Sequence, residues 1–228
     1  YELNINPDYD YTVVTHGATM GIHESQSRLF ENLVGRSRAF VHYLYPTLKE
    51  LFPAQLADVS AEEIWRAVNR AEPGLIRTEA DELTYCLHIM VRYELERRMF
   101  AGELTAHDLP AEWNRLYKAY LGVDVPNDRE GILQDSHWAN GNIGYFPSYA
   151  IGSAYGAQYL RQMQKDFDVS AAVATGRLTQ INCWLEEKIW KYGCMKDPTP
   201  LFESVCGPFD PTCYTAYLRD KFTEVYGL

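Results

Sequence analysis

The sequence predicts a mainly α-helical fold, on three observations. Apolar residues recur at spacings of three and four over several long segments, which is the period of one buried helix face. Helix start and stop residues, among them prolines in front and glycines behind, bracket these segments. No segment alternates apolar and polar side chains as a half-buried strand does. We therefore expect a compact multi-helix α fold without a sheet.

Two helices are expected in the first third of the chain. The first covers residues 20–45, where the apolar positions form one stripe, and Pro46 is expected to end or kink it. Ser60 and Glu63 have the spacing of a capping box, in which the hydroxyl accepts from the backbone amide and the carboxylate reaches back. The second helix is expected to run from this box through Asn69.

A long helix is expected over residues 80–100, because six apolar residues share one face and no glycine or proline interrupts the segment. A further helix is expected over residues 111–121. Pro110 stands in front of it and Gly122 stands directly behind it, which is the usual asymmetry of helix ends.

The second half of the chain predicts loops followed by three helical segments. Residues 124–144 are rich in Gly, Asn and Asp and have no clear period, so we expect loops there. Helical segments are expected at residues 145–163, 178–192 and 212–226. No fixed-period repeat or Ser/Gly linker separates the segments, so residues 1–228 are expected to share one core.

The composition excludes several classes of partner. The 228 residues carry 21 Lys+Arg and 31 Asp+Glu, a net charge of −10, and the basic residues are scattered. Such a surface repels phosphate backbones and anionic lipid, so we expect neither nucleic acid nor a membrane as partner. No apolar window approaches the ~20 residues of a membrane span, and no signal-peptide pattern opens the chain. Five cysteines without a CxxC pair indicate reduced thiols and a cytoplasmic protein.

The segment GIHESQSR at residues 21–28 is chemically unusual. Glu24 and Arg28 are four apart on the expected helix, so the plainest interpretation is a surface ion pair. His23 and Glu24 are adjacent in sequence, and on a helix their side chains point ~100° apart, so they are not expected to coordinate one metal ion together. One of them alone remains a candidate ligand.

A second group of candidates lies in residues 131–149, where glycines alternate with His, Trp and Tyr. This pattern is typical of a pocket wall, although a buried aromatic loop satisfied by backbone groups fits it as well. In a pocket, His137 and Tyr145 are donors suited to a developing oxyanion. Arg77 stands just before the long helix. Its guanidinium group could bind a ligand carboxylate through two parallel hydrogen bonds, or it could simply form an ion pair with Asp81.

Taken together, four segments resemble the signature segments of the Taq-type metallocarboxypeptidases, and they occur in the same order. They are GIHESQSR at 21–28, IRTEAD at 76–81, GILQDSHW at 131–138 and GYFPSY at 144–149. The similarity runs from Tyr1 nearly to Leu228. Four separate motifs in order are far more specific than a single short pattern.

The resemblance implies an activity and a role for each candidate. In that family an HExxH helix gives two histidines and a general base to a zinc site, and a later glutamate is the third ligand. The resemblance therefore implies Glu24 as metal ligand and Arg77 as anchor of the free C-terminal carboxylate of a peptide. By analogy with related dipeptidases, it implies His137 and Tyr145 as oxyanion donors. It further implies Zn²⁺, or Co²⁺ in its place, peptide substrates, a homodimer, and a fold in which this chain forms one wall of a deep substrate groove.

The HExxH segment itself does not occur in the 228 residues. The only His-Glu pair is at residues 23 and 24, with Ser27 where a second histidine would stand. The chain opens YEL, which resembles the stretch just after HExxH in the family. We therefore expect the chain to be the C-terminal part of a single catalytic domain. With one metal ligand of three and no general base, the chain alone is expected to be inactive and to bind no stoichiometric zinc.

An alternative function is a non-catalytic helical peptide-binding protein that keeps the groove but not the metal site. The codons upstream of Tyr1 separate the two hypotheses, because an intact HExxH favours the enzyme and its absence favours the binder. A purely structural helical oligomer explains less, since it gives no reason for Arg77, Gln134, His137 and Tyr145 to occur in these motifs.

Overall fold

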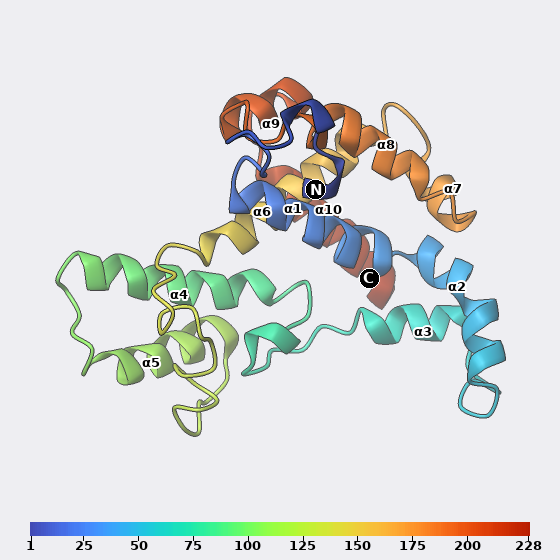
Figure 1. Ribbon diagram of the computed structural model, residues 1–228. Helices are drawn as coiled ribbons and strands as arrows, with labels where there is room; N and C mark the ends of the chain where they lie inside the picture. Colours follow the sequence, from blue (N-terminus) through green and yellow to red (C-terminus); the bar gives the residue numbers. More distant parts are fainter. The chain divides into compact units, whose positions relative to one another are not determined.

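A computed structural model describes residues 1–228 (Figure 1). It contains ten α-helices, several short 3₁₀ turns, one π-helix and no strand, which confirms the mainly α prediction. The contacts divide the chain into two compact units. Unit 1 comprises Tyr1–Asn69 and Ile151–Leu228, and unit 2 comprises Arg70–Ala150. No helix combines the length and the hydropathy that a membrane crossing requires.

Unit 1 is built from three helices of the first chain segment and five of the last. Their bounds are α1 Met20–Arg28, α2 Arg38–Leu51, α3 Ala61–Val68, α6 Pro147–Met163, α7 Val169–Ala174, α8 Thr179–Lys188, α9 Pro198–Cys206 and α10 Thr212–Tyr226. The first residues of α6 belong to unit 2. Unit 2 otherwise contains two helices, α4 Tyr85–Phe100 and α5 Leu109–Leu121.

The expected helix over residues 20–45 is in fact interrupted. After α1 ends at Arg28, the chain forms a π-helix over Leu29–Gly35, and α2 begins only after Ser37. The Ser37 hydroxyl accepts a hydrogen bond from the backbone N–H of Phe40 at 3.2 Å, so it caps a new helix. The apolar stripe continues across the break, which is why the period alone did not reveal it.

Pro46 does not end a helix, since it lies inside α2, which continues to Leu51.

The capping box at the start of α3 is confirmed. The Ser60 hydroxyl accepts from the Glu63 N–H at 3.2 Å, and the Glu63 carboxylate accepts from the Ser60 N–H at 2.8 Å. α3 ends at its predicted position, with Asn69 as C-cap.

The helices of unit 2 follow the predicted end signals with one shift. α4 begins at Tyr85 instead of residue 80, because the Asp81 carboxylate accepts from the Thr84 N–H at 2.9 Å and from its hydroxyl at 2.7 Å and so holds a turn. α5 has Pro110 in its first turn and ends at Gly122, whose φ of 74° is the left-handed cap. α4 and α5 pack side by side (Figure 1).

Two glycines of α6 allow α1 to approach closely in unit 1. A Cβ at Gly152 would lie 2.7 Å from the backbone carbon and the Cβ of Glu24, and one at Gly156 would lie 3.3 Å from the Ser25 carbonyl oxygen. Ile22, on the same helix as Glu24, is fully buried in the largest apolar cluster of the unit. The position of Glu24 is therefore fixed by backbone packing.

Gly152→Ala should lower the free energy of unfolding by about 1–3 kcal/mol, although alanine favours a helix, because the added methyl group overlaps the α1 backbone. Chemical denaturation of the chain measures the change. Gly74→Ala is the matched control, because a Cβ there meets nothing within 4 Å. Equal stability of the two variants would show that α1 and α6 do not pack as closely as described.

Candidate functional site

Unit 2 contains a buried cluster in which two arginines share one carboxylate. Asp135 Oδ1 accepts from Arg77 Nε at 3.0 Å and Nη2 at 2.7 Å, and Asp135 Oδ2 accepts from Arg92 Nε at 2.6 Å. The side chains of Arg77, Arg92 and Asp135 are 7%, 0% and 9% exposed. Two positive charges and one negative charge leave the cluster with a net charge of +1, which favours an anionic ligand.

A glutamine and a tyrosine hold both guanidinium groups in place. Gln134 Oε1 accepts from the Arg77 backbone N–H at 2.8 Å and from Arg92 Nη2 at 2.9 Å. The Gln134 amide nitrogen donates to the Leu75 carbonyl oxygen at 3.0 Å, which fixes its orientation. Arg77 Nη1 donates to the Tyr85 hydroxyl at 2.9 Å.

Aromatic rings cover the faces of both arginines. The guanidinium carbons of Arg77 and Arg92 lie 5.7 Å and 5.3 Å from the ring centre of buried Phe146. Arg77 also lies 4.9 Å from the Tyr149 ring, and Arg92 lies 4.5 Å from the Trp113 ring. Cation–π contacts of this kind stabilise a positive charge without neutralising it, so the rings leave the net charge of the cluster intact.

The charges in the cluster persist at neutral pH. Burial acts to raise the pKa of Asp135, but hydrogen bonds and charges from Arg77 and Arg92 outweigh it and lower that pKa. Burial acts to lower the pKa of Arg77, but hydrogen bonds to Asp135 and Tyr85 and the charges of these two groups outweigh burial and raise that pKa. The ionised forms therefore support each other.

His137 and Tyr145 lie in the same unit as Arg77. His137 Nε2 is 3.1 Å from the Tyr149 hydroxyl, and its Nδ1 is buried, 3.9 Å from Asp135 Oδ1, without a hydrogen-bond partner. The ring centres of His137 and Tyr145 are 5.5 Å apart, and the His137 ring lies 4.4 Å from that of Phe146 at an interplanar angle of 36°. Burial lowers the pKa of His137, which favours the neutral imidazole at pH 7.

From the sequence, Arg92 was interpreted as a packing and hydrogen-bond residue with no site role, and the acidic residue that fixes the neighbouring loop was missed. Arg92 stands on the buried face of α4 between Val91 and Leu95, and an arginine among buried apolar positions is the signal that could have found it. Glu96, one turn further on, is also buried and accepts from Trp138 Nε1 at 2.6 Å and from the Gly144 N–H at 3.2 Å. Glu96 thus fixes both ends of the loop between these residues.

The histidine behind the cluster is held neutral. His88 is fully buried, and its Nδ1 is 3.1 Å from the Tyr117 hydroxyl, which also accepts from Arg92 Nη1 at 3.2 Å. Burial, followed by the positive charges of Arg92 and Arg77, lowers the pKa of His88 to about 4. The folded protein therefore resists protonation of this ring.

Acidification should destabilise the chain through His88. Between pH 6.5 and pH 4 the unfolded state binds a proton that the folded state does not, so the free energy of unfolding falls as the pH falls, by up to about 3 kcal/mol at the acid end. Denaturant titrations at pH 7 and pH 5 measure the loss. His88→Gln should lose less over this interval, and an identical loss in both proteins would assign the effect to other groups.

Glu24 lies in unit 1, on α1, and is half-buried. Its Oε2 accepts from the Ser27 hydroxyl at 2.7 Å. His23 turns to other partners, since its Nε2 is 3.4 Å from Glu2 Oε1 and its ring lies 4.9 Å from that of Tyr1. Because Glu24 and the arginine cluster belong to different units, the predicted groove that unites them stays a prediction.

The chain alone does not offer a complete metal site. No group of three or more His, Cys, Asp or Glu residues is placed to hold a metal ion. A catalytic zinc site requires about three protein ligands, and Glu24 is a single carboxylate. The residues present therefore do not fit a metal on their own, and Glu24 as a ligand requires donors from outside these 228 residues.

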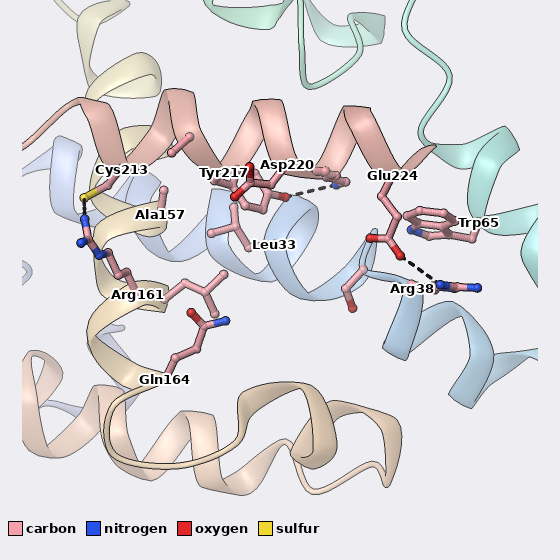
Figure 2. Close-up of a pocket in the computed structure, with 14 residues that line it drawn as sticks. Leu33, Arg38, Trp65, Ala157, Arg161, Gln164, Cys213, Tyr217, Asp220 and Glu224 are labelled. Atoms are coloured by element: carbon pink, nitrogen blue, oxygen red, sulfur yellow. Dashed lines mark hydrogen bonds and ion pairs between the residues drawn. The ribbon is translucent and has the colours of Figure 1, made fainter. Parts of the chain in front are cut away.

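A cavity of about 600 Å³ in unit 1 is lined by none of the four predicted site residues. Figure 2 shows Arg161 and Cys213 at one end of it and Arg38 and Glu224 at the other. Arg161 Nη1 donates to Cys213 Sγ at 3.2 Å, and Arg38 Nη1 donates to Glu224 Oε1 at 2.9 Å. The four residues at the two ends of the cavity thus already pair with each other.

Comparison with known proteins identifies the family. Residues 1–222 match the family model described as carboxypeptidase Taq (M32) metallopeptidase. The chain is 42% identical over 228 residues to carboxypeptidase 1 of Bacillus subtilis and 40% identical over 224 residues to thermostable carboxypeptidase 1 of Pyrococcus furiosus. These alignments cover 99% and 97% of the chain but only 46% and 45% of the relatives.

Solved structures agree with this assignment. The M32 carboxypeptidase from Deinococcus radiodurans R1 superimposes with a TM-score of 0.96 at 42% identity, over 100% of this chain and 46% of that one. The chain thus spans about half the length of the relatives it matches. On both sequence and structure, it belongs to the carboxypeptidase Taq (M32) metallopeptidase family.

Proposed function

We propose that a longer protein containing this chain is a metal-dependent carboxypeptidase that releases residues from the C-terminus of peptides. The observation that carries the proposal is the buried cluster of Arg77, Arg92 and Asp135, with its net charge of +1. An exopeptidase must recognise a chain end, and the free carboxylate of a peptide is the anion that distinguishes that end. The family supports a metallopeptidase.

Arg77 is the proposed anchor for this carboxylate. Of its five N–H groups, Nε and one on Nη2 donate to Asp135, and one on Nη1 donates to Tyr85. One N–H therefore remains on each terminal nitrogen for a ligand. Asp135 and Tyr85 hold the guanidinium plane fixed, so less conformational entropy is lost when a carboxylate binds.

Asp135 alone would neutralise Arg77, and Arg92 prevents this. Because Arg92 bonds to the second oxygen of the same carboxylate, the negative charge is shared between two guanidinium groups. Arg92 is therefore proposed as the residue that preserves the positive charge of the anchor.

His137 and Tyr145 are the proposed donors to the oxyanion that forms at the scissile carbonyl. A neutral imidazole carries one N–H, and the lowered pKa of His137 supports that form. The Tyr145 hydroxyl is the second donor, and its ring neighbours that of His137 at 5.5 Å. Donors that are already in position when charge develops stabilise a transition state without reorganisation.

Glu24 is proposed as one ligand of the metal, with zinc as the metal and cobalt as the alternative. The close packing of α1 on α6 supports this role, because a ligand must be held in a fixed position. Inactivity of the 228-residue chain alone, a homodimer and a cytoplasmic location belong to the same proposal.

Arg77→Ala in the longer protein should raise KM for peptides with a free C-terminal carboxylate by about 100-fold and change KM for C-terminal amides little. Steady-state assays on matched acid and amide peptides measure the split. Arg129→Ala, at an exposed arginine of the same unit, is the control and should leave both KM values unchanged. Equal losses on acids and amides would remove Arg77 from the anchoring role.

A further inference from the structure

A cysteine and a histidine that are not among the predicted site residues meet at the surface of unit 1. Cys194 Sγ lies 3.4 Å from His16 Nε2, within hydrogen-bonding distance for sulfur. His16 is exposed and Cys194 is partly exposed. The two residues are 178 positions apart in sequence, so the fold and not local geometry brings them together.

The hydrogen bond that His16 makes through Nδ1 leaves Nε2 as the ring atom that can accept a proton. Its Nδ1 is 3.0 Å from the carbonyl oxygen of Gly17. A carbonyl oxygen only accepts, so in the neutral ring the proton sits on Nδ1 and Nε2 carries a lone pair. That lone pair faces the thiol of Cys194, which is the arrangement of a thiol nucleophile with an adjacent base.

The backbone fixes the pair. Gly193 has a φ of 51°, and a Cβ there would lie 2.3 Å from the Val14 carbonyl oxygen, so this position accepts only glycine. The Cys194 N–H donates to the same Val14 oxygen at 3.2 Å. Cys194 Sγ also lies 3.6 Å from the Val13 carbonyl oxygen. These contacts hold the thiol against the segment that carries His16.

We propose that Cys194, with His16 as its base, is a modification site that takes up small-molecule disulfides such as oxidised glutathione. The thiol proton passes to His16 Nε2 as the sulfur attacks one sulfur of the small disulfide. The disulfide bond of the small molecule breaks and a bond between Cys194 Sγ and one glutathionyl sulfur forms. The departing glutathione thiolate takes the proton back from His16. One protein thiol and one disulfide thus give one mixed disulfide and one glutathione thiol.

Three of the other cysteines have environments that are less suited to this exchange. Burial raises the pKa of the Cys206 thiol to about 12, and Cys213 is buried. Cys183 is exposed but has no histidine as hydrogen-bond partner, which makes it an internal reference for a thiol without a base. The proposal therefore predicts selectivity for Cys194 over Cys183 within one molecule.

The test uses the intact 228-residue chain, reduced and then exposed to oxidised glutathione at neutral pH. Peptide mass spectrometry at timed intervals gives the rate of glutathionyl addition at each cysteine. Cys194 should react about tenfold faster than Cys183. His16→Asn, whose amide can still donate to the Gly17 carbonyl, should reduce the Cys194 rate to that of Cys183 and leave the Cys183 rate unchanged. His107→Asn, at an exposed histidine of unit 2, should change neither rate.

Equal rates at Cys194 and Cys183 in the unmodified chain would overturn the proposal, as would a Cys194 rate that His16→Asn leaves unchanged. Circular dichroism of each variant shows whether the fold is retained. The rate at buried Cys213 is a second check, because an unfolded variant would also react faster at that thiol. None of these measurements depends on metal binding or peptidase activity, so the proposal stands or falls separately from the proposed function.

Discussion

Glu24→Gln in a longer protein that contains this chain should retain far less than one metal ion per molecule after dialysis. The substitution keeps the size of the side chain and the packing of α1. It removes the negative charge through which a carboxylate ligand binds a divalent metal ion. Elemental analysis of protein dialysed against metal-free buffer measures the loss, and peptidase activity should fall in parallel.

Glu31→Gln is the matched control for this result. Glu31 lies in the π-helix that follows α1 and forms exposed ion pairs with Arg28 at 3.1 Å and Arg36 at 3.3 Å. Its loss should leave the metal content unchanged. If Glu24→Gln retains as much metal as Glu31→Gln, Glu24 is not a ligand, and its place in the family motif has another cause.

Asp135→Asn should destabilise the 228-residue chain by about 3–5 kcal/mol. The substitution leaves two buried guanidinium groups without an anion, and the removal of one partner of a buried ion pair costs far more than the pair contributes. Chemical denaturation at pH 7 measures the change in the free energy of unfolding. The destabilisation should be largest at pH values at which Asp135 is ionised in the unmodified chain, and the lowered pKa of Asp135 extends this range to lower pH.

Asp124→Asn provides the comparison, because Asp124 pairs with Lys118 at 2.7 Å but is 85% exposed. A surface pair of this kind contributes about 0–1 kcal/mol. A double substitution of Asp135 and Arg92 to leucine should be less destabilising than the sum of the single changes, since it removes opposite charges together. Similar effects of Asp135→Asn and Asp124→Asn would contradict the buried cluster.

The sequence predicted the helices that carry explicit end signals. The capping box of Ser60 and Glu63, and the bracket of Pro110 and Gly122, each placed a helix within two residues of its observed end. α7 and α9 were missed, because six and nine residues are too few to establish a period. The break after α1 was also missed, since the apolar stripe runs through it without a proline.

The candidate site could be predicted only in part, for a physical reason. Short motifs indicated Arg77, His137 and Tyr145, and the structure places all three in unit 2. The partners that give Arg77 its electrostatic character were not predicted. Asp135 lies 58 residues from Arg77 and 43 from Arg92 in sequence, so the fold alone brings them together. Spacing along the chain carries no information about such contacts.

We propose that a longer protein containing this chain shortens peptides from their C-terminal end. The most direct measurement is mass spectrometry of one peptide, as free acid and as C-terminal amide, incubated with the longer protein with and without a chelator. The account predicts stepwise loss of single residues from the C-terminus of the acid, abolished by the chelator, and no processing of the amide. Cleavage at internal bonds, equal processing of acid and amide, or peptide binding without any cleavage would contradict it.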